Sequence, residues 1–257
     1  MDKKWMRATV SIGLLVGWAA VCVAGTPPLD EIRLGVILSA EVEDHVFVLG
    51  PLGLSAEKTK GYLSSLAQEL AFSKELKPDW PDWSFARIQS VYCQAGVGGA
   101  RRFADLMADP SKVIVCETLE ELIKNCNCVI LFNTGGQGEA NFELVSSCLR
   151  AGQPAFVDKF LSPDLCETRT LLKLAKERGV PLMSSSYIWT SQPGLEFKEK
   201  LGGRRLSKVI STGWSGKNIA ADIHAIAQLQ LLSGDRRPLR VSTRERDGLS
   251  KAVVVFE

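Results

Sequence analysis

Histidine is scarce in this 257-residue chain, which contains only two, His45 and His224. The sequence has no H-E-x-x-H motif, and Cys126 and Cys128 have neither a second cysteine pair nor a nearby histidine to complete four zinc ligands. A G-x-S-x-G motif is absent as well, so nothing supports an α/β-type serine hydrolase. The sequence therefore predicts neither a metal centre nor a serine nucleophile.

An excess of charge of one sign is also lacking. Thirty-one Lys and Arg residues balance 29 Asp and Glu residues, and the net charge is +2. There is no long run of like charge, no internal repeat and no low-complexity tract. Because this balance does not indicate a nucleic-acid partner, we expect an ordinary globular protein, as its 46% hydrophobic residues also suggest.

The N-terminal segment has the pattern of an export signal. A basic start, MDKKWMR, is followed by a stretch from Ala8 to Leu29 without a charged side chain. Small residues at Ala24 and Gly25 suit signal peptidase, so residues 1–25 are predicted to direct export to the periplasm or the cell exterior. The alternative is an uncleaved membrane anchor, since about 20 apolar residues span a bilayer.

Six of the seven cysteines follow this leader. An even number in an exported protein is compatible with disulfides, but spacing gives no connectivity. Cys93 and Cys116 lie in apolar runs, where a cysteine behaves as a small hydrophobic residue. Buried thiols are the other interpretation, and both remain open.

Strand and helix patterns alternate after the leader, over a predicted domain at 30–190. Because the strands are almost entirely apolar and are separated by helices, we expect an α/β fold with a Rossmann-like parallel sheet and helices on both faces. The predicted strands are 32–38, 86–93, 112–116, 128–133, 154–158 and 180–186. The predicted helices are 56–76, 99–108, 118–125, 139–152 and 162–179, with caps at Thr118 and Ser162, Pro163 in the first turn of the last helix and Gly179 after its end.

A smaller, apparently truncated α+β domain is predicted at 204–257. It has a strand at 206–214, a helix at 218–234 that contains His224, and strands at 239–246 and 251–257. Because such a short sheet would leave apolar strand edges unpaired, we expect that the chain could form homo-oligomers through them.

Polar residues follow two of the predicted parallel strands. Ligands bind beyond the carboxyl ends of such strands. Asn133, Thr134 and Gly135 follow one strand, and Asp158 and Lys159 end the next. The sequence therefore predicts a ligand site at this edge of the sheet.

The span from about 86 to 234 resembles the glucose–fructose oxidoreductase/inositol dehydrogenase (Gfo/Idh/MocA) family. The residues that carry the resemblance are CVILFNTGG, LRAGQPAFVDKFLSP, LLKLAKERGVPLMSSSYIWTSQP and IAADIHAIAQLQLLSG. In that family a strand ends at a Glu-Lys-Pro motif whose lysine reaches substrate and nicotinamide. Here the matching residues are Asp158, Lys159 and Phe160, and His224 matches the family's helical histidine.

This resemblance implies NAD- or NADP-dependent hydride transfer at a carbon of a sugar-like or cyclitol alcohol. Lys159 and His224 would be the acid/base pair, because burial can tune either residue type toward neutral pH. Asn133, Thr134, Gly135 and Asp158 would contact the cofactor.

The chain departs from the family pattern at the phosphate-binding loop. A dinucleotide fingerprint needs glycines after the first strand, but the sequence VILSAEVEDHVFVLG has none between Gly35 and Gly50. After the second strand, Gly96 and Gly98 lead to Arg101, which would accept the 2′-phosphate of NADP; a flexible turn with a solvated arginine is the alternative.

Three further departures favour a different function. Ala220 occupies the position of the family's aspartate, Phe160 replaces its proline, and the second domain is short. The alternative prediction is therefore a non-catalytic exported relative that kept the fold as a ligand-binding or assembly protein.

Overall fold

The computed structural model describes residues 31–39, 44–72, 85–132, 140–185, 192–204, 206, 209, 219–233, 236–246 and 249–257. The predicted export signal lies outside these residues. The chain folds into two compact units, the first ending at Ser184 and the second spanning Ser185–Glu257, and each is described by itself. Among the described residues, no helix is long and apolar enough to cross a membrane.

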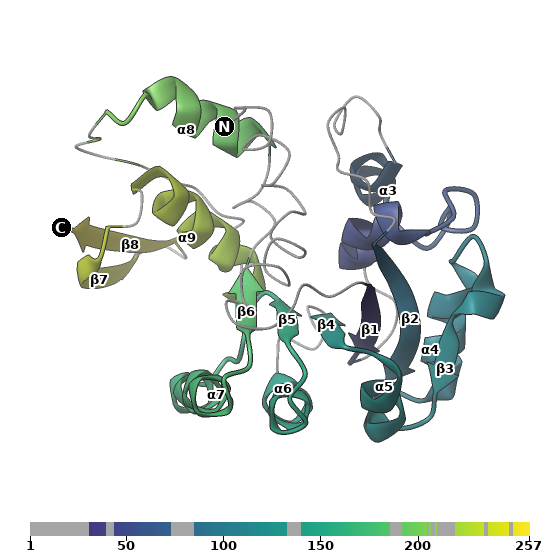
Figure 1. Ribbon diagram of the computed structural model, residues 1–257. Helices are drawn as coiled ribbons and strands as arrows, with labels where there is room; N and C mark the ends of the chain where they lie inside the picture. Colours follow the sequence, from purple (N-terminus) through teal and green to yellow (C-terminus); the bar gives the residue numbers. More distant parts are fainter. Residues whose placement is uncertain are drawn as a thin grey trace, which may run out of the picture. The chain divides into compact units, whose positions relative to one another are not determined.

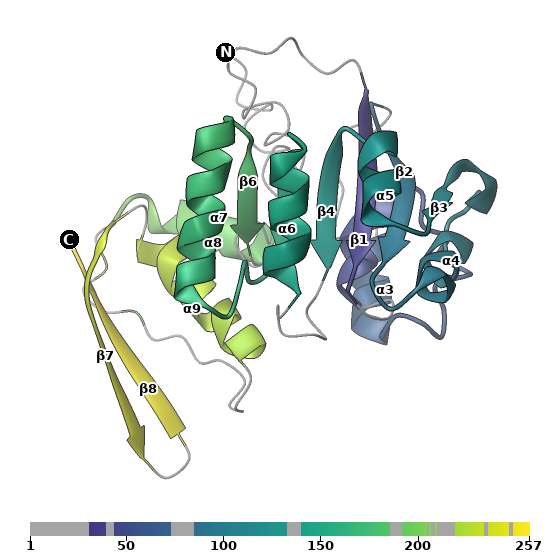
Figure 2. The same cartoon turned by 90° about the horizontal axis from the view of Figure 1, so that it is seen from below.

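A six-stranded sheet in the order β3-β2-β1-β4-β5-β6 forms the centre of the first unit (Figures 1 and 2). β1 pairs with β2 and β4, β2 pairs with β3, and β4 pairs with β5, all in parallel. This confirms the predicted Rossmann-like sheet. The strands are β1 (Ile32–Leu38), β2 (Ala86–Cys93), β3 (Ile114–Cys116), β4 (Cys128–Phe132), β5 (Ala155–Asp158) and β6 (Leu182–Ser185).

Helices cover both faces of the sheet, as its apolar strands require. Figure 1 shows α5, α6 and α7 on one face and α3 on the other. One face of the sheet is covered by η1 (Asp44–Leu52), α3 (Ser65–Phe72) and α4 (Val97–Asp105), and the other by α5 (Leu119–Asn125), α6 (Asn141–Arg150) and α7 (Leu165–Arg178). Neighbouring residues of β4 point to opposite faces, so Ile130 packs in the core with η1, α3 and α4, and Leu131 packs in the core with α5, α6 and α7.

The predicted helix at 56–76 is wrong in its first half. α3 begins only at Ser65, and the 3-10 helix η1 was not predicted. Leu54 instead forms an isolated antiparallel bridge with Met107, and Gly61 has φ 87, which is outside the helical range. Tertiary pairing with the end of α4 therefore decides this segment, rather than its apolar spacing.

The start of α7 also differs from the prediction. Ser162 does not cap it; the Asp164 carboxylate accepts hydrogen bonds from Cys166 N and Glu167 N at 2.6 and 3.0 Å. Pro163 consequently lies before the helix and not in its first turn. A carboxylate at this position satisfies two backbone donors and complements the helix dipole.

Other helix ends match the sequence closely. Thr118 caps α5 by accepting from Glu121 N, and Gly179 ends α7 in the left-handed region with φ 62. Both were predicted, because cap chemistry depends on local sequence alone.

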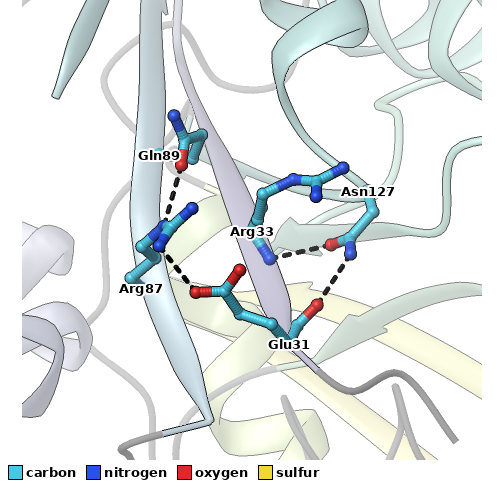
Figure 3. Close-up of polar contacts among 5 residues, drawn as sticks. All are labelled: Glu31, Arg33, Arg87, Gln89 and Asn127. Atoms are coloured by element: carbon cyan, nitrogen blue, oxygen red, sulfur yellow. Dashed lines mark hydrogen bonds and ion pairs between the residues drawn. The ribbon is translucent and has the colours of Figure 1, made fainter.

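A cluster of polar residues lies at the edge of the sheet where β1, β2 and β4 begin (Figure 3). The Asn127 side chain accepts from Arg33 N at 2.8 Å and donates to the Glu31 carbonyl at 2.8 Å. Arg87 contacts the Glu31 carboxylate at 2.7 Å and donates to Gln89. Asn127 thus ties the start of β1 to the start of β4, and this edge is occupied by interactions within the protein.

Among its described residues, the second unit contains two helices and an antiparallel pair of strands. These are α8 (Gln192–Leu201), α9 (Ile219–Ser233), β7 (Pro238–Arg246) and β8 (Leu249–Phe256). α9 and both strands match their predictions within two residues, whereas α8 was not predicted. Its sequence QPGLEFKEKL has Pro193 and Gly194 directly after Gln192, and this pair suggests a loop, although proline is tolerated in the first turn of a helix. The predicted strand at 206–214 lies largely outside the described residues.

Candidate functional site

The order of the strands reverses between β1 and β4, which places a topological switch point there. From β1 the chain continues to the face of η1 and α3, and from β4 to the face of α6. Ser39 N donates to Phe132 O at 3.2 Å, and Gln94 N donates to Leu38 O at 2.8 Å, so the carboxyl ends of β4, β1 and β2 meet at one edge. Open α/β sheets bind their ligands at such a point.

Lys159 and Asp158 lie at this edge, at the carboxyl end of β5. They are deeply buried, with exposed fractions of 4% and 8%. Leu131 of β4 pairs with Val157 of β5, so the two residues stand one strand away from the switch point. Both residues have interaction partners. The burial decides against an ordinary solvated lysine at a strand end, because such a lysine keeps its ammonium group in water.

The loop after Lys159 is fixed by contacts that the sequence did not reveal. Asn141 Nδ2, at the start of α6, donates to the Phe160 carbonyl at 2.8 Å, and Asn141 is 0% exposed. Further along, Ser162 Oγ donates to Glu167 Oε2 at 2.5 Å. The peptide bond between Lys159 and Phe160 is cis. No sequence pattern points to Asn141, because its partner is a backbone atom 19 residues away.

The glycine loop after β2 reaches the same edge of the sheet. Gly96 has φ 113, and α4 begins at the next residue without a side-chain cap. A Cβ added at Gly98 would meet only Arg102 Nη1 at 3.8 Å, so the backbone is open on that side. Arg101 is exposed. A helix start with open backbone and an adjacent cation is suited to a phosphate group.

The two groups of candidate residues lie on either side of the switch point. β2 and β5 are separated by β1 and β4, which corresponds to about 14 Å across the sheet at the usual strand spacing. A dinucleotide lies across the sheet in this way, with its two halves on opposite sides of the reversal in strand order. The arrangement therefore fits the adenosine end near Gly96 and Gly98 and the nicotinamide end near Lys159.

The segment after β1 fits a dinucleotide less well. The first regular element there is the 3-10 helix η1 with Pro51 inside it, whereas the fingerprint would place a glycine turn and an α-helix. Val46 and Leu49 of η1 are fully buried in the core. The backbone at Gly50 approaches Ala71 so closely that a Cβ would lie 2.6 Å from the Ala71 carbonyl oxygen. The described residues 44–52 therefore serve packing and do not form the α-helix that the fingerprint would place there.

The remaining candidates stay predictions. Asn133, Thr134 and Gly135 lie outside the described residues, although they follow β4 directly. His224 is half-buried in α9 of the second unit and has an interaction partner. Its relation to Lys159 is a prediction.

The cysteines of the described residues are thiols, five buried and Cys166 exposed. Burial raises the pKa of Cys116 to about 11 and that of Cys126 to about 12, so both are protonated at neutral pH. Within the described part of the chain, no group of three or more His, Cys, Asp or Glu residues is arranged to hold a metal ion. The interpretation of buried thiols agrees with five of these cysteines, whereas Cys166 is exposed.

No protein-family model matches the chain, and no curated protein matches it in sequence. Solved structures do resemble it. The UDP-N-acetylglucosamine 3-dehydrogenase GnnA from Acidithiobacillus ferrooxidans is 14% identical with a TM-score of 0.59, over 88% of this chain and 64% of GnnA. GenD2 from gentamicin A biosynthesis, solved in complex with NAD, is 17% identical with a TM-score of 0.53, over 91% of this chain and 65% of GenD2.

These similarities concern the fold, because the identities are low, and the chain spans less than two thirds of the length of either protein. They agree with the Rossmann-like parallel sheet of the first unit. The resemblance read from the sequence is thus confirmed at the level of the fold, which this chain shares with dehydrogenases of the Gfo/Idh/MocA type.

Proposed function

We propose that the chain is a nicotinamide-dependent oxidoreductase that acts on a hydroxyl-bearing carbon of a sugar-like or cyclitol substrate. The observation that carries this proposal is the burial of Lys159, 4% exposed, one strand away from the switch point. Open α/β sheets bind their ligands at this edge, and a buried lysine can be tuned toward neutral pH for proton transfer, which supports a functional role for Lys159.

In this proposal Lys159 exchanges a proton with the substrate hydroxyl, and His224 assists as the second acid/base group. The nicotinamide cofactor, when bound, supplies the hydride chemistry. Asp158 lies beside Lys159 and is also buried, so it helps to define the site. Asn133, Thr134 and Gly135 would contact the cofactor from the end of β4.

The loop after β2 supports NADP as the preferred cofactor. Gly96 and Gly98 leave the backbone open, and Arg101 is exposed nearby. Gln94 stands where an acidic side chain would hold the ribose hydroxyls of NAD. A 2′-phosphate would meet the Arg101 cation there, and the neutral amide of Gln94 would not repel it as a carboxylate would.

A fluorescence titration of the chain from Thr26 onward with NADPH and NADH tests the cofactor proposal. Arg101→Ala is expected to weaken NADPH binding roughly tenfold, the effect of losing one charge-assisted hydrogen bond, and to leave NADH binding unchanged. The matched control is Arg150→Ala, an exposed arginine in the last turn of α6. Equal losses in the two variants would contradict a specific role for Arg101.

A substrate screen with both cofactors tests the enzymatic proposal, and UDP-N-acetylglucosamine belongs in it because GnnA acts on that sugar nucleotide. Lys159→Met is expected to lower kcat at least 100-fold, within the usual contribution of a general acid or base. Lys173→Met is the control, since Lys173 is exposed on α7 and contacts Glu177. Full activity of Lys159→Met would disprove the assigned role.

The second candidate is a non-catalytic relative that retained the fold for ligand binding or assembly. The 3-10 helix η1 after β1 favours it, because this element replaces the glycine turn that cradles a diphosphate. Absence of saturable binding for both NADPH and NADH would support this candidate over the oxidoreductase.

A further inference from the structure

We propose that Asn141 is a positioning residue, which fixes the backbone that carries Lys159. The inference rests on the proposed function, in which Lys159 is the acid/base group. It concerns a residue that neither the sequence pattern nor the family resemblance singled out. Its basis is the hydrogen bond of 2.8 Å from Asn141 Nδ2 to the Phe160 carbonyl.

The Asn141 Nδ2 group donates to the loop after β5, and Asn141 is not the N-cap of its own helix. Asparagine is favoured as an N-cap, but the N-cap of α6 is Ala140, which makes no side-chain cap, and Asn141 is the first helical residue. Its amide is fully buried and is directed to the loop after β5. Because the partner is a carbonyl oxygen, which only accepts, the NH₂ group of the amide faces it.

The bond satisfies an acceptor that the sheet does not reach. β5 ends at Asp158, so the strand ladder stops before Phe160. Phe160 is buried, and a buried carbonyl left without a donor costs free energy. Asn141 supplies that donor at the residue immediately after Lys159.

The rest of the loop is held from α7. Ser162 Oγ donates to Glu167 Oε2 and accepts from Asp164 N at 3.0 Å. The loop therefore has one attachment to α6 and another to α7, and the attachment to α6 is adjacent to Lys159. Removing the Asn141 donor releases the end of the loop that carries the lysine, while the end near α7 stays in place.

Chemical labelling provides a test that does not depend on turnover. Lys159 is 4% exposed, so acetic anhydride should acylate it slowly in the native chain. Asn141→Ala is expected to raise the labelling rate of Lys159 roughly tenfold, together with amide hydrogen exchange over 159–162, because the orphaned carbonyl favours an opened loop. Asn141→Leu keeps a similar side-chain size, removes the donor and should act alike; it serves if the alanine variant folds poorly.

Gln153→Ala is the matched control. The Gln153 amide also donates to backbone carbonyls, those of Ile123 and Cys126 at 3.1 and 3.2 Å, but it lies beyond the other end of α6. Labelling of Lys159 in this variant is expected to stay within twofold of the wild type. Similar Lys159 labelling in Asn141→Ala and Gln153→Ala would overturn the inference.

Kinetics separate this inference from the proposed function. With an active wild type, Asn141→Ala should lower kcat about tenfold and leave the KM for the cofactor unchanged, whereas Gln153→Ala should alter neither. Faster Lys159 labelling in Asn141→Ala alone, with an inactive wild type, would support the positioning role and reject the oxidoreductase. An unchanged kcat and pH profile in Asn141→Ala would reject the positioning role and leave the oxidoreductase intact.

Discussion

At Gly35 in β1, α5 and the residue after it pack so close to the sheet that a methyl group has no room. A Cβ at this position would lie 2.7 Å from Cys126 Sγ and 2.8 Å from Leu122 Cδ2, whereas real Cβ contacts essentially never fall below 3.0 Å. Both neighbours are buried, so relief requires α5 to move. Overpacking of this kind costs about 1–3 kcal/mol. We expect Gly35→Ala to lower the free energy of unfolding by about 2 kcal/mol.

A double-mutant cycle with Cys126→Ala identifies the cause. Removing Sγ eliminates the shortest contact, but Leu122 remains, so the relief should be partial. Cys126→Ala alone should cost about 1 kcal/mol through the cavity it leaves. In its background, Gly35→Ala should cost about 1 kcal/mol less than in the wild type, within the usual coupling of contacting residues. The assay is urea unfolding of the reduced chain at constant slope m.

The same assay includes a glycine with room. Gly98→Ala should be neutral or stabilise by up to about 1 kcal/mol, since Gly98 lies inside α4 and a Cβ there would have its nearest neighbour at 3.8 Å. An equal cost of Gly35→Ala with and without Cys126 Sγ would refute the reasoning. So would a Gly35→Ala variant as stable as Gly98→Ala.

Three other predictions concern thiols, pH and the glycine loop. At pH 8 only Cys166 of the six cysteines after Thr26 should react rapidly with DTNB, and urea should release the remainder, because burial protects them. The hydrogen bond from Ser111, followed by one from Lys112, lowers the pKa of Asp109. The lowered pKa of Asp109 stabilises the fold at pH values above the unfolded pKa of about 4, and this stabilisation is lost as the pH falls through the pKa of Asp109 in the folded chain. Ser111→Ala should raise the Asp109 pKa in a carbon-13 NMR titration, and an unchanged pKa would contradict this. Gly98→Ala should weaken NADPH binding several-fold although the fold is kept, and an unaltered titration would show that the phosphate does not approach this backbone.

The sequence by itself determined the sheet and its ligand-binding edge. Runs such as 32–38 and 128–132 are apolar on both sides, which is possible only for strands covered by helices on two faces. Since β strands and α helices alternate, the strands are parallel, and their carboxyl ends share one edge. The position of Lys159 at that edge follows from these local rules. So do the helix ends at Thr118 and Gly179, where each signal depends on neighbours within a few residues.

Only the tertiary structure decided how the edge is built. The depth at which Lys159 is buried could not be read from the sequence. The hydrogen bond from Asn141 that fixes its loop joins residues 19 positions apart, and its acceptor is a backbone carbonyl, which carries no sequence signal. The bridge from Leu54 to Met107 likewise overrides the helical spacing of residues 56–64. Periodicity reports which face of an element is apolar, but not which partner it meets, because packing free energy depends on contacts between segments distant in sequence.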